Sequence, residues 1–150
     1  MKRIVILGTG GTIAGQARRS DSHVGYTAAQ ISVDDLVAGV PALAGLPLEA
    51  EQVAQVDSKD MSFALWRALA ARVAHHLARD EVAGVVITHG TDTLEETAYF
   101  LQRVLAPAKP VVLTAAMRPA TAPSADGPQN LLDAVRVAAL PGVRGVLACV

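Results

Sequence analysis

The sequence has little of what marks several common classes of protein. It contains one cysteine, Cys149, so the chain forms no internal disulfide. Its net charge is −1 with no basic block, which argues against nucleic acid and acidic membrane surfaces as partners. No apolar run is long enough to cross a membrane. Aromatic residues make up only 3% of a chain that is 51% hydrophobic, so we expect an aliphatic core.

Spacings typical of metal and nucleotide sites are also missing. His75 and His76 are adjacent, which is not the spacing of two ligands on one helix face, so we predict no metal site. A dinucleotide-binding fingerprint that starts at Gly8 would need glycine where Ile13 stands. A P-loop would need Lys and then Ser or Thr at positions 16 and 17, which hold Gln and Ala. The sequence therefore predicts no phosphate-bearing cofactor.

What is present is a glycine-rich turn at residues 8–15 (GTGGTIAG), directly after a β-branched apolar run. Glycines at this density let backbone N–H groups crowd around a bound group. One interpretation is that Thr12 is a nucleophile held beside backbone donors. The other is an ordinary strand-to-loop turn whose threonines cap N–H groups. This stretch taken by itself leaves both open.

Along the rest of the chain, apolar runs alternate with helical patterns, which is typical of parallel βαβ units. We predict one α/β domain with a flavodoxin-like, three-layer fold and the strand order 2-1-3-4-5. The expected strands are residues 4–7, 48–56, 82–88, 111–115 and 145–150, and the expected helices are residues 32–40, 62–79, 93–105 and 126–140. Residues 16–30 are polar and are predicted to form a loop.

This strand order has a consequence for chemistry. It brings the loops that carry Thr12, Ser58 and the Thr91–Asp92 pair to one edge of the sheet, where open α/β sheets bind ligands. Three polar loops at one edge predict a site for a small polar molecule.

The loop before the third helix offers other polar groups. Thr93 and Glu96 are expected to form a capping box, which leaves Thr91 and Asp92 to face the site. Asp92 has the alternative role of a favourable charge at the helix N-terminus. His89 has no carboxylate partner in the sequence, and we do not expect it to touch substrate.

These residues resemble a known family. Residues 8–15 and 89–98 (HGTDTLEETA) are similar to the two signatures of bacterial-type L-asparaginases, the asparaginase/glutaminase family. Residues 57–61 (DSKDM) resemble that family's substrate loop, and residues 116–119 and 124–131 resemble further family stretches. The resemblance spans essentially the whole chain.

The resemblance implies hydrolysis of the side-chain amide of L-asparagine to L-aspartate and ammonia, with varying glutaminase activity and no cofactor. Thr12 would be the nucleophile that forms an acyl-enzyme, and Tyr26 its activating partner on a mobile loop. Thr91 and Asp92 would form a second catalytic set that also binds substrate, Asp92 through the α-amino group. Ser58 would bind the α-carboxylate. Lys59 follows Ser58 at a position that varies in the family, which bears on substrate preference.

The resemblance also concerns parts beyond this sequence. Family members are longer, so residues 1–150 would be the N-terminal catalytic domain, without the smaller C-terminal domain. A lysine that completes the Thr91–Asp92 set would follow Val150, and a glutamate would come from a partner subunit. The expected assembly is a homo-oligomer (a dimer or a homotetramer) in the cytoplasm, or in the periplasm if a leader is removed. If the chain ends at Val150, the alternative is a non-catalytic domain that binds an amino acid or supplies an assembly surface.

Overall fold

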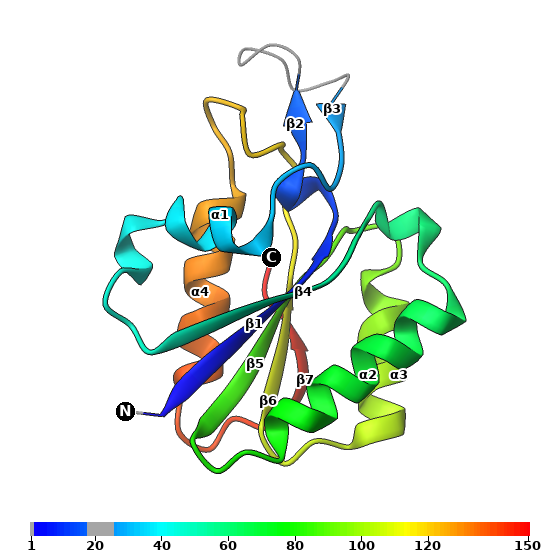
Figure 1. The fold of residues 1–150 in the computed structure, drawn as a ribbon, viewed down its shortest axis with the longest axis vertical. Coiled ribbons are helices and arrows are strands. Elements are labelled where there is room, and N and C mark those ends of the chain that lie inside the picture. Colours follow the sequence, from blue (N-terminus) through cyan, green and yellow to red (C-terminus); the bar gives the residue numbers. More distant parts are fainter. Residues whose placement is uncertain (1, 18–25) are drawn as a thin grey trace.

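Five parallel strands form a sheet between two layers of helices in the computed structural model, which describes residues 2–17 and 26–150 (Figure 1). The strands are β1 (Arg3–Gly10), β4 (Leu48–Val56), β5 (Val82–Thr88), β6 (Pro110–Thr114) and β7 (Gly145–Ala148). Their order is β4-β1-β5-β6-β7, and every neighbouring pair is parallel. Counted along the chain this is 2-1-3-4-5, so the predicted fold and strand order are confirmed.

Helices α1 (Val33–Ala38) and α4 (Gly127–Ala139) cover one face of the sheet, and α2 (Phe63–Leu77) and α3 (Leu94–Leu105) cover the other (Figure 1). The predicted starts of two helices, at residues 32 and 62, are confirmed. The hydroxyl oxygens of Ser32 and Ser62 accept hydrogen bonds from the backbone N–H groups of Asp35 and Leu65. Three short 3-10 helices complete the fold: η1 (Thr12–Ala14), η2 (Pro41–Leu43) and η3 (Ser58–Asp60).

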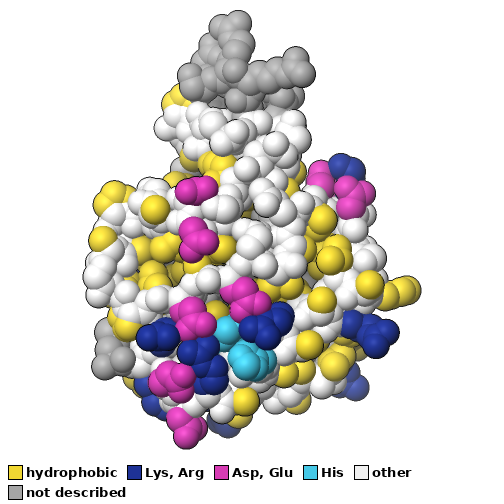
Figure 2. Space-filling model, in the orientation of Figure 1, with side chains coloured by type: hydrophobic (Ala, Val, Ile, Leu, Met, Phe, Trp, Pro, Cys, Tyr) yellow, Lys and Arg dark blue, Asp and Glu magenta, His cyan; other side chains and the backbone are white. Residues whose placement is uncertain are grey.

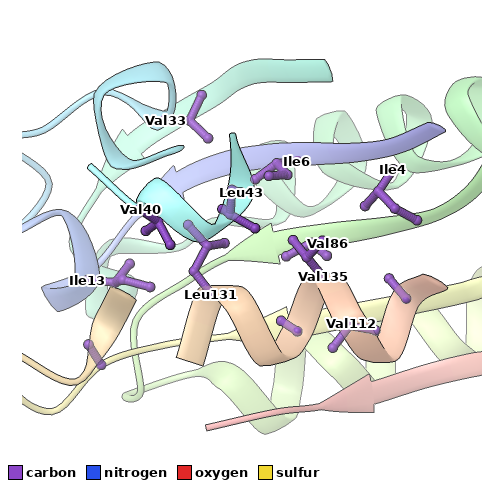
Figure 3. Close-up of a cluster of buried hydrophobic side chains, with 13 residues drawn as sticks. Ile4, Ile6, Ile13, Val33, Val40, Leu43, Val86, Val112, Leu131 and Val135 are labelled. Carbon is purple, nitrogen blue, oxygen red and sulfur yellow. The ribbon is translucent and has the colours of Figure 1, made fainter. Parts of the chain in front are cut away.

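The core is aliphatic and lies on both faces of the sheet, because successive residues of the central strands point to opposite sides. Ile6, Val86 and Val112 pack with residues of α1 and α4, such as Val33 and Leu131 (Figure 3). The next residue of each strand, Leu7, Ile87 or Leu113, packs against α2 and α3. The side chains of these six strand residues are fully buried. Burial on both faces rigidly fixes the strand ends from which the site loops emerge.

One predicted loop contains more structure than we expected. Residues 16–30 were predicted to be a loop, but their ends form a two-stranded antiparallel sheet of β2 (Gln16–Ala17) and β3 (Tyr26–Thr27). This part of the prediction is wrong, because strands of two residues are too short to show a hydrophobic alternation. In Figure 1 the pair rises from the edge of the main sheet where the strands end. Residues 18–25 lie outside the described residues.

No helix among the described residues is long and apolar enough to pass through a membrane.

Candidate active site

The loops that follow β1 and β5 meet through two glycines. A Cβ atom placed on Gly11 would lie 2.6 Å from Cα of Gly90. The φ angle of Gly11 is 79°, a backbone conformation that favours glycine. Gly11 N–H donates to the carbonyl of Val56 at the end of β4 (2.9 Å). Because neither glycine has a side chain, the two backbones lie in direct contact. The turn that carries Thr12 is thereby fixed against the loop that carries Thr91 and Asp92.

Ser58 joins the third loop to this contact. A Cβ atom on Gly90 would lie 2.7 Å from the Cβ atom of Ser58, so Gly90 also lets the η3 loop approach. The Ser58 hydroxyl oxygen accepts a hydrogen bond from the Asp92 N–H (3.1 Å), and the side chain is 3% exposed. Its hydroxyl proton remains available for a second bond, since a serine hydroxyl both accepts and donates. The predicted convergence of the three loops is therefore found in the structure.

Thr12 is the first residue of η1 and directly follows the Gly11 contact. Its side chain is half-buried, and its carbonyl accepts a hydrogen bond from the Gly15 N–H (2.8 Å), which closes the turn. The turn continues into Ile13, which is buried against the α4 side of the core. Thr12 is thus held between a fixed glycine contact and a buried isoleucine, at the carboxyl end of the first strand.

Thr91 and Asp92 lie directly before α3, where the Thr91 side chain is half-buried and that of Asp92 is exposed. The predicted capping box is wrong. The Thr93 hydroxyl makes no capping bond to α3 but donates to the Ser58 carbonyl oxygen (2.9 Å). The hydroxyl bonds to Ser58 instead of α3 because folding brings the Ser58 carbonyl close to it. The spacing of residues in the sequence does not reveal this contact. Together with the Asp92 N–H bond, it gives two connections between the loops.

His89 is part of the core. Its ring is fully buried, with Nδ1 2.7 Å from the Gly90 carbonyl oxygen and Nε2 3.0 Å from Oγ1 of Thr97. Thr97 Oγ1 also accepts a hydrogen bond from Nε1 of Trp66 (2.8 Å). Burial lowers the pKa of His89 below its ordinary value, which favours the neutral ring. The sequence analysis missed the roles of Thr97 and Trp66, and no local signal could have found them, because the three residues come from separate elements.

Charge at the site comes from the η3 loop. Lys59 Nζ donates to the Asp57 carboxylate (2.7 Å), and Asp57 holds the pKa of Lys59 above its ordinary value, with smaller contributions from Asp60 and Asp92. The same pairing holds the pKa of Asp57 below its usual range. The Lys59 ammonium therefore lies within electrostatic reach of Asp92, next to Ser58.

The remaining predicted residue, Tyr26, begins β3 and pairs with Ala17. The side chain of Tyr26 and residues 18–25 lie outside the described residues, so the predicted mobile loop and the approach of the phenol to Thr12 stay predictions. Thr91 also lines a cavity of about 140 Å³ together with residues that include Met117, Asp126 and Val150. Among the described residues, no three His, Cys, Asp or Glu side chains are grouped to bind a metal ion.

Comparison with known proteins gives consistent matches over the whole chain. Residues 3–150 match a family model described as the N-terminal part of asparaginase. The chain is 46% identical to L-asparaginase 2 of Bacillus subtilis and 45% identical to a glutaminase-asparaginase of Pseudomonas fluorescens, each over 146 residues. Those alignments cover 97% of this chain but only 39% and 40% of the relatives, so the chain spans about two fifths of their length.

The fold is matched by a crystal structure as well. A protein of Campylobacter jejuni described as a probable cytoplasmic L-asparaginase superimposes with a TM-score of 0.95 at 46% identity. The match covers 100% of this chain and 46% of that one.

Proposed function

Since this chain belongs to the asparaginase family, we propose that it is the N-terminal catalytic domain of an enzyme that hydrolyses the side-chain amide of L-asparagine. The observation that carries this proposal is the meeting of the Thr12, Ser58 and Thr91–Asp92 loops through the Gly11–Gly90 contact. The matched family and the relatives' names support the substrate class, including L-glutamine as a second substrate.

The proposed reaction has two steps. The Thr12 hydroxyl oxygen attacks the amide carbon, the carbon–nitrogen bond breaks, and the hydroxyl proton passes through the Tyr26 phenol to the nitrogen that leaves as ammonia. Water, activated at the Thr91–Asp92 set, then attacks the Thr12 ester. This second attack releases L-aspartate and restores the hydroxyl. No cofactor takes part in this scheme.

The other site residues bind the amino-acid end of the substrate. Ser58 keeps a hydroxyl proton to donate to the α-carboxylate while its oxygen accepts from Asp92 N–H. The exposed Asp92 carboxylate accepts from the α-ammonium group, and Thr91 contributes beside it.

Ammonia release from L-asparagine and L-glutamine by the complete gene product tests the proposal, with Thr12→Ala as the control. We expect residues 1–150 alone to release far less ammonia, because the lysine and the partner's glutamate of the family scheme would come from other parts of the protein. Losing one member of a catalytic set costs on the order of a thousandfold in rate. Comparable turnover by the two proteins would contradict the need for a second domain. Substrate binding without any ammonia release by the complete protein would instead support a non-catalytic binding domain.

We further propose a homotetramer in the cytoplasm, as the family resemblance implies. The Campylobacter jejuni relative, described as cytoplasmic, supports the location. Light scattering after gel filtration of the complete protein tests the assembly, and cell fractionation tests the location. A monomer, or recovery in the periplasmic fraction, would contradict the respective proposal.

A further inference from the structure

The hydrogen bonds behind the site, which centre on the fully buried His89 and Thr97 side chains, have a defined direction. The Gly90 carbonyl can only accept, so the proton of the neutral His89 ring is on Nδ1 (2.7 Å) and Nε2 is an acceptor. The Thr97 hydroxyl therefore donates to Nε2 (3.0 Å), and its oxygen accepts from Trp66 Nε1–H (2.8 Å). Every hydrogen bond in this series therefore has a defined donor and a defined acceptor. The series begins at Trp66 in α2, passes through Thr97 in α3 and the His89 ring, and ends at the Gly90 carbonyl.

This direction fixes the peptide that joins Gly90 to Thr91. The carbonyl and the N–H of a trans peptide point in opposite directions, and the described residues contain no cis peptide. Because the Gly90 carbonyl points into the core at His89, the Thr91 N–H points out of the core. Among the described residues nothing accepts a hydrogen bond from this N–H, whereas the next one, of Asp92, is bonded to Ser58.

We propose that His89, oriented by Thr97, is a positioning residue that directs the Thr91 N–H toward the oxygen of the reacting amide. This rests on the function proposed above. Without the His89 bond no hydrogen bond from the described residues holds the Gly90 carbonyl, so the peptide can tilt and misplace a donor that must meet developing charge. Trp66 acts one step further away, by keeping the Thr97 hydroxyl proton on the His89 side.

Two matched variants of the complete protein test this inference. Thr97→Val keeps the shape of the side chain but removes both hydrogen-bonding roles, whereas Thr97→Ser keeps the hydroxyl. For Thr97→Val we expect kcat for L-asparagine to fall about tenfold or more with little change in KM, because the lost donor acts in the transition state. Thr97→Ser should restore most of kcat. Thr114→Val is the control, since Thr114 is a fully buried threonine whose hydroxyl has no partner among the described residues.

A purely structural role predicts a different result. Thr97→Val would then lower the melting temperature while each folded molecule kept the kcat of the wild type, and this outcome would overturn the proposal. If Thr97→Val does not fold, His89→Asn and His89→Gln replace it. The shorter Asn amide lies nearer the Nδ1 position and can donate to the Gly90 carbonyl, whereas the Gln amide extends toward the Nε2 position. We expect Asn to retain more kcat, and equal losses would contradict the proposal.

A readout besides activity separates this inference from the proposed function. Nitrogen NMR of the His89 ring should show a neutral imidazole protonated at Nδ1, and a ring protonated at Nε2 would overturn the orientation argument. If the wild type releases no ammonia, the proposed function fails, and the NMR result alone then decides whether His89 fixes the Gly90–Thr91 peptide.

Discussion

The site edge and the outer surface of β4 hold their polar groups in different ways. On the outer surface a charged cluster consists of Glu49, Glu51, Arg72 and Arg79 around the buried ring of His76. Figure 2 shows acidic, basic and histidine side chains as neighbours on this face. Arg79 donates to both carboxylate oxygens of Glu49 (2.9 Å each), and Arg72 donates to both of Glu51 (2.6 and 2.9 Å). These bonds join side chains to side chains, at least partly in contact with solvent.

At the site edge the bonds instead join side chains to backbone, and two glycines bring the backbones into contact. The long side chains of such ion pairs can shift when a neighbouring atom is added or removed, because they are partly in contact with solvent. A backbone contact has no such freedom to adjust. The candidate site therefore depends on backbone geometry, and we expect it to be far more sensitive to a single added or removed atom than the charged cluster.

The largest effect should come from Thr12, the proposed nucleophile. Thr12→Ala in the complete protein should lower ammonia release by on the order of a thousandfold or more, because no other hydroxyl can take its place in the two-step reaction. Thr12→Ser keeps a nucleophilic oxygen and should retain measurable turnover. Circular dichroism should show both variants folded. Turnover by Thr12→Ala close to that of the wild type would rule out Thr12 as nucleophile.

The glycine contact should come next. Gly11→Ala adds a methyl group against the Gly90 backbone at a φ of 79°, so we expect a destabilisation of about 3 kcal/mol or more, together with loss of activity. Gly142 is a matched control, because its φ is 82° and nothing lies within 4 Å of an added Cβ atom. Gly142→Ala should cost only about 1 kcal/mol. Equal losses for the two variants in urea unfolding would show that the contact is unimportant.

The two regions should also lose stability in different ranges of pH. His89 has a lowered pKa in the folded protein, so the unfolded chain takes up the proton first and stability falls as the pH drops below 6.5. Arg79 lowers the pKa of Glu49 to about 2, so this contribution to stability is complete above pH 4.5 and is lost as the pH falls toward 2.

Urea unfolding as a function of pH separates these contributions. His89→Asn should flatten the curve between pH 6.5 and 4.5, whereas Glu49→Gln should change its slope only below pH 4.5. If His89→Asn leaves the slope between pH 6.5 and 4.5 unchanged, His89 is not the group that titrates in that range.

The smallest effect should be a gain in the free energy of unfolding. The hydroxyl oxygens of Thr88 and Thr114 are buried without a hydrogen-bond partner in the described part of the chain. Valine has the same shape and no polar atom, so Thr114→Val should raise the free energy of unfolding by up to about 1 kcal/mol. The activity of the complete protein should not change. A clear loss of stability would show that the Thr114 hydroxyl has a partner in solution.

Much of the fold could be predicted because its signals are local. Apolar runs and helical periodicity locate the main sheet, and the strand order then places Thr12, Ser58 and Thr91 at one edge. The β2–β3 pair could not be predicted, since two-residue strands carry no periodic signal. The Thr93 hydroxyl bonds to Ser58 instead of capping α3, and Ser58 is 35 residues away in the sequence. A local pattern cannot reveal such a distant partner. The link from Trp66 through Thr97 to His89 is likewise visible only after the elements have packed.

We propose that this fold presents Thr12 as the residue that becomes acylated. Mass spectrometry of the complete protein, quenched during turnover of a slowly hydrolysed amide analogue, tests it most directly. We expect an ester adduct on the peptide that contains Thr12, and no adduct in Thr12→Ala. An adduct on the peptide that contains Thr91 would contradict it.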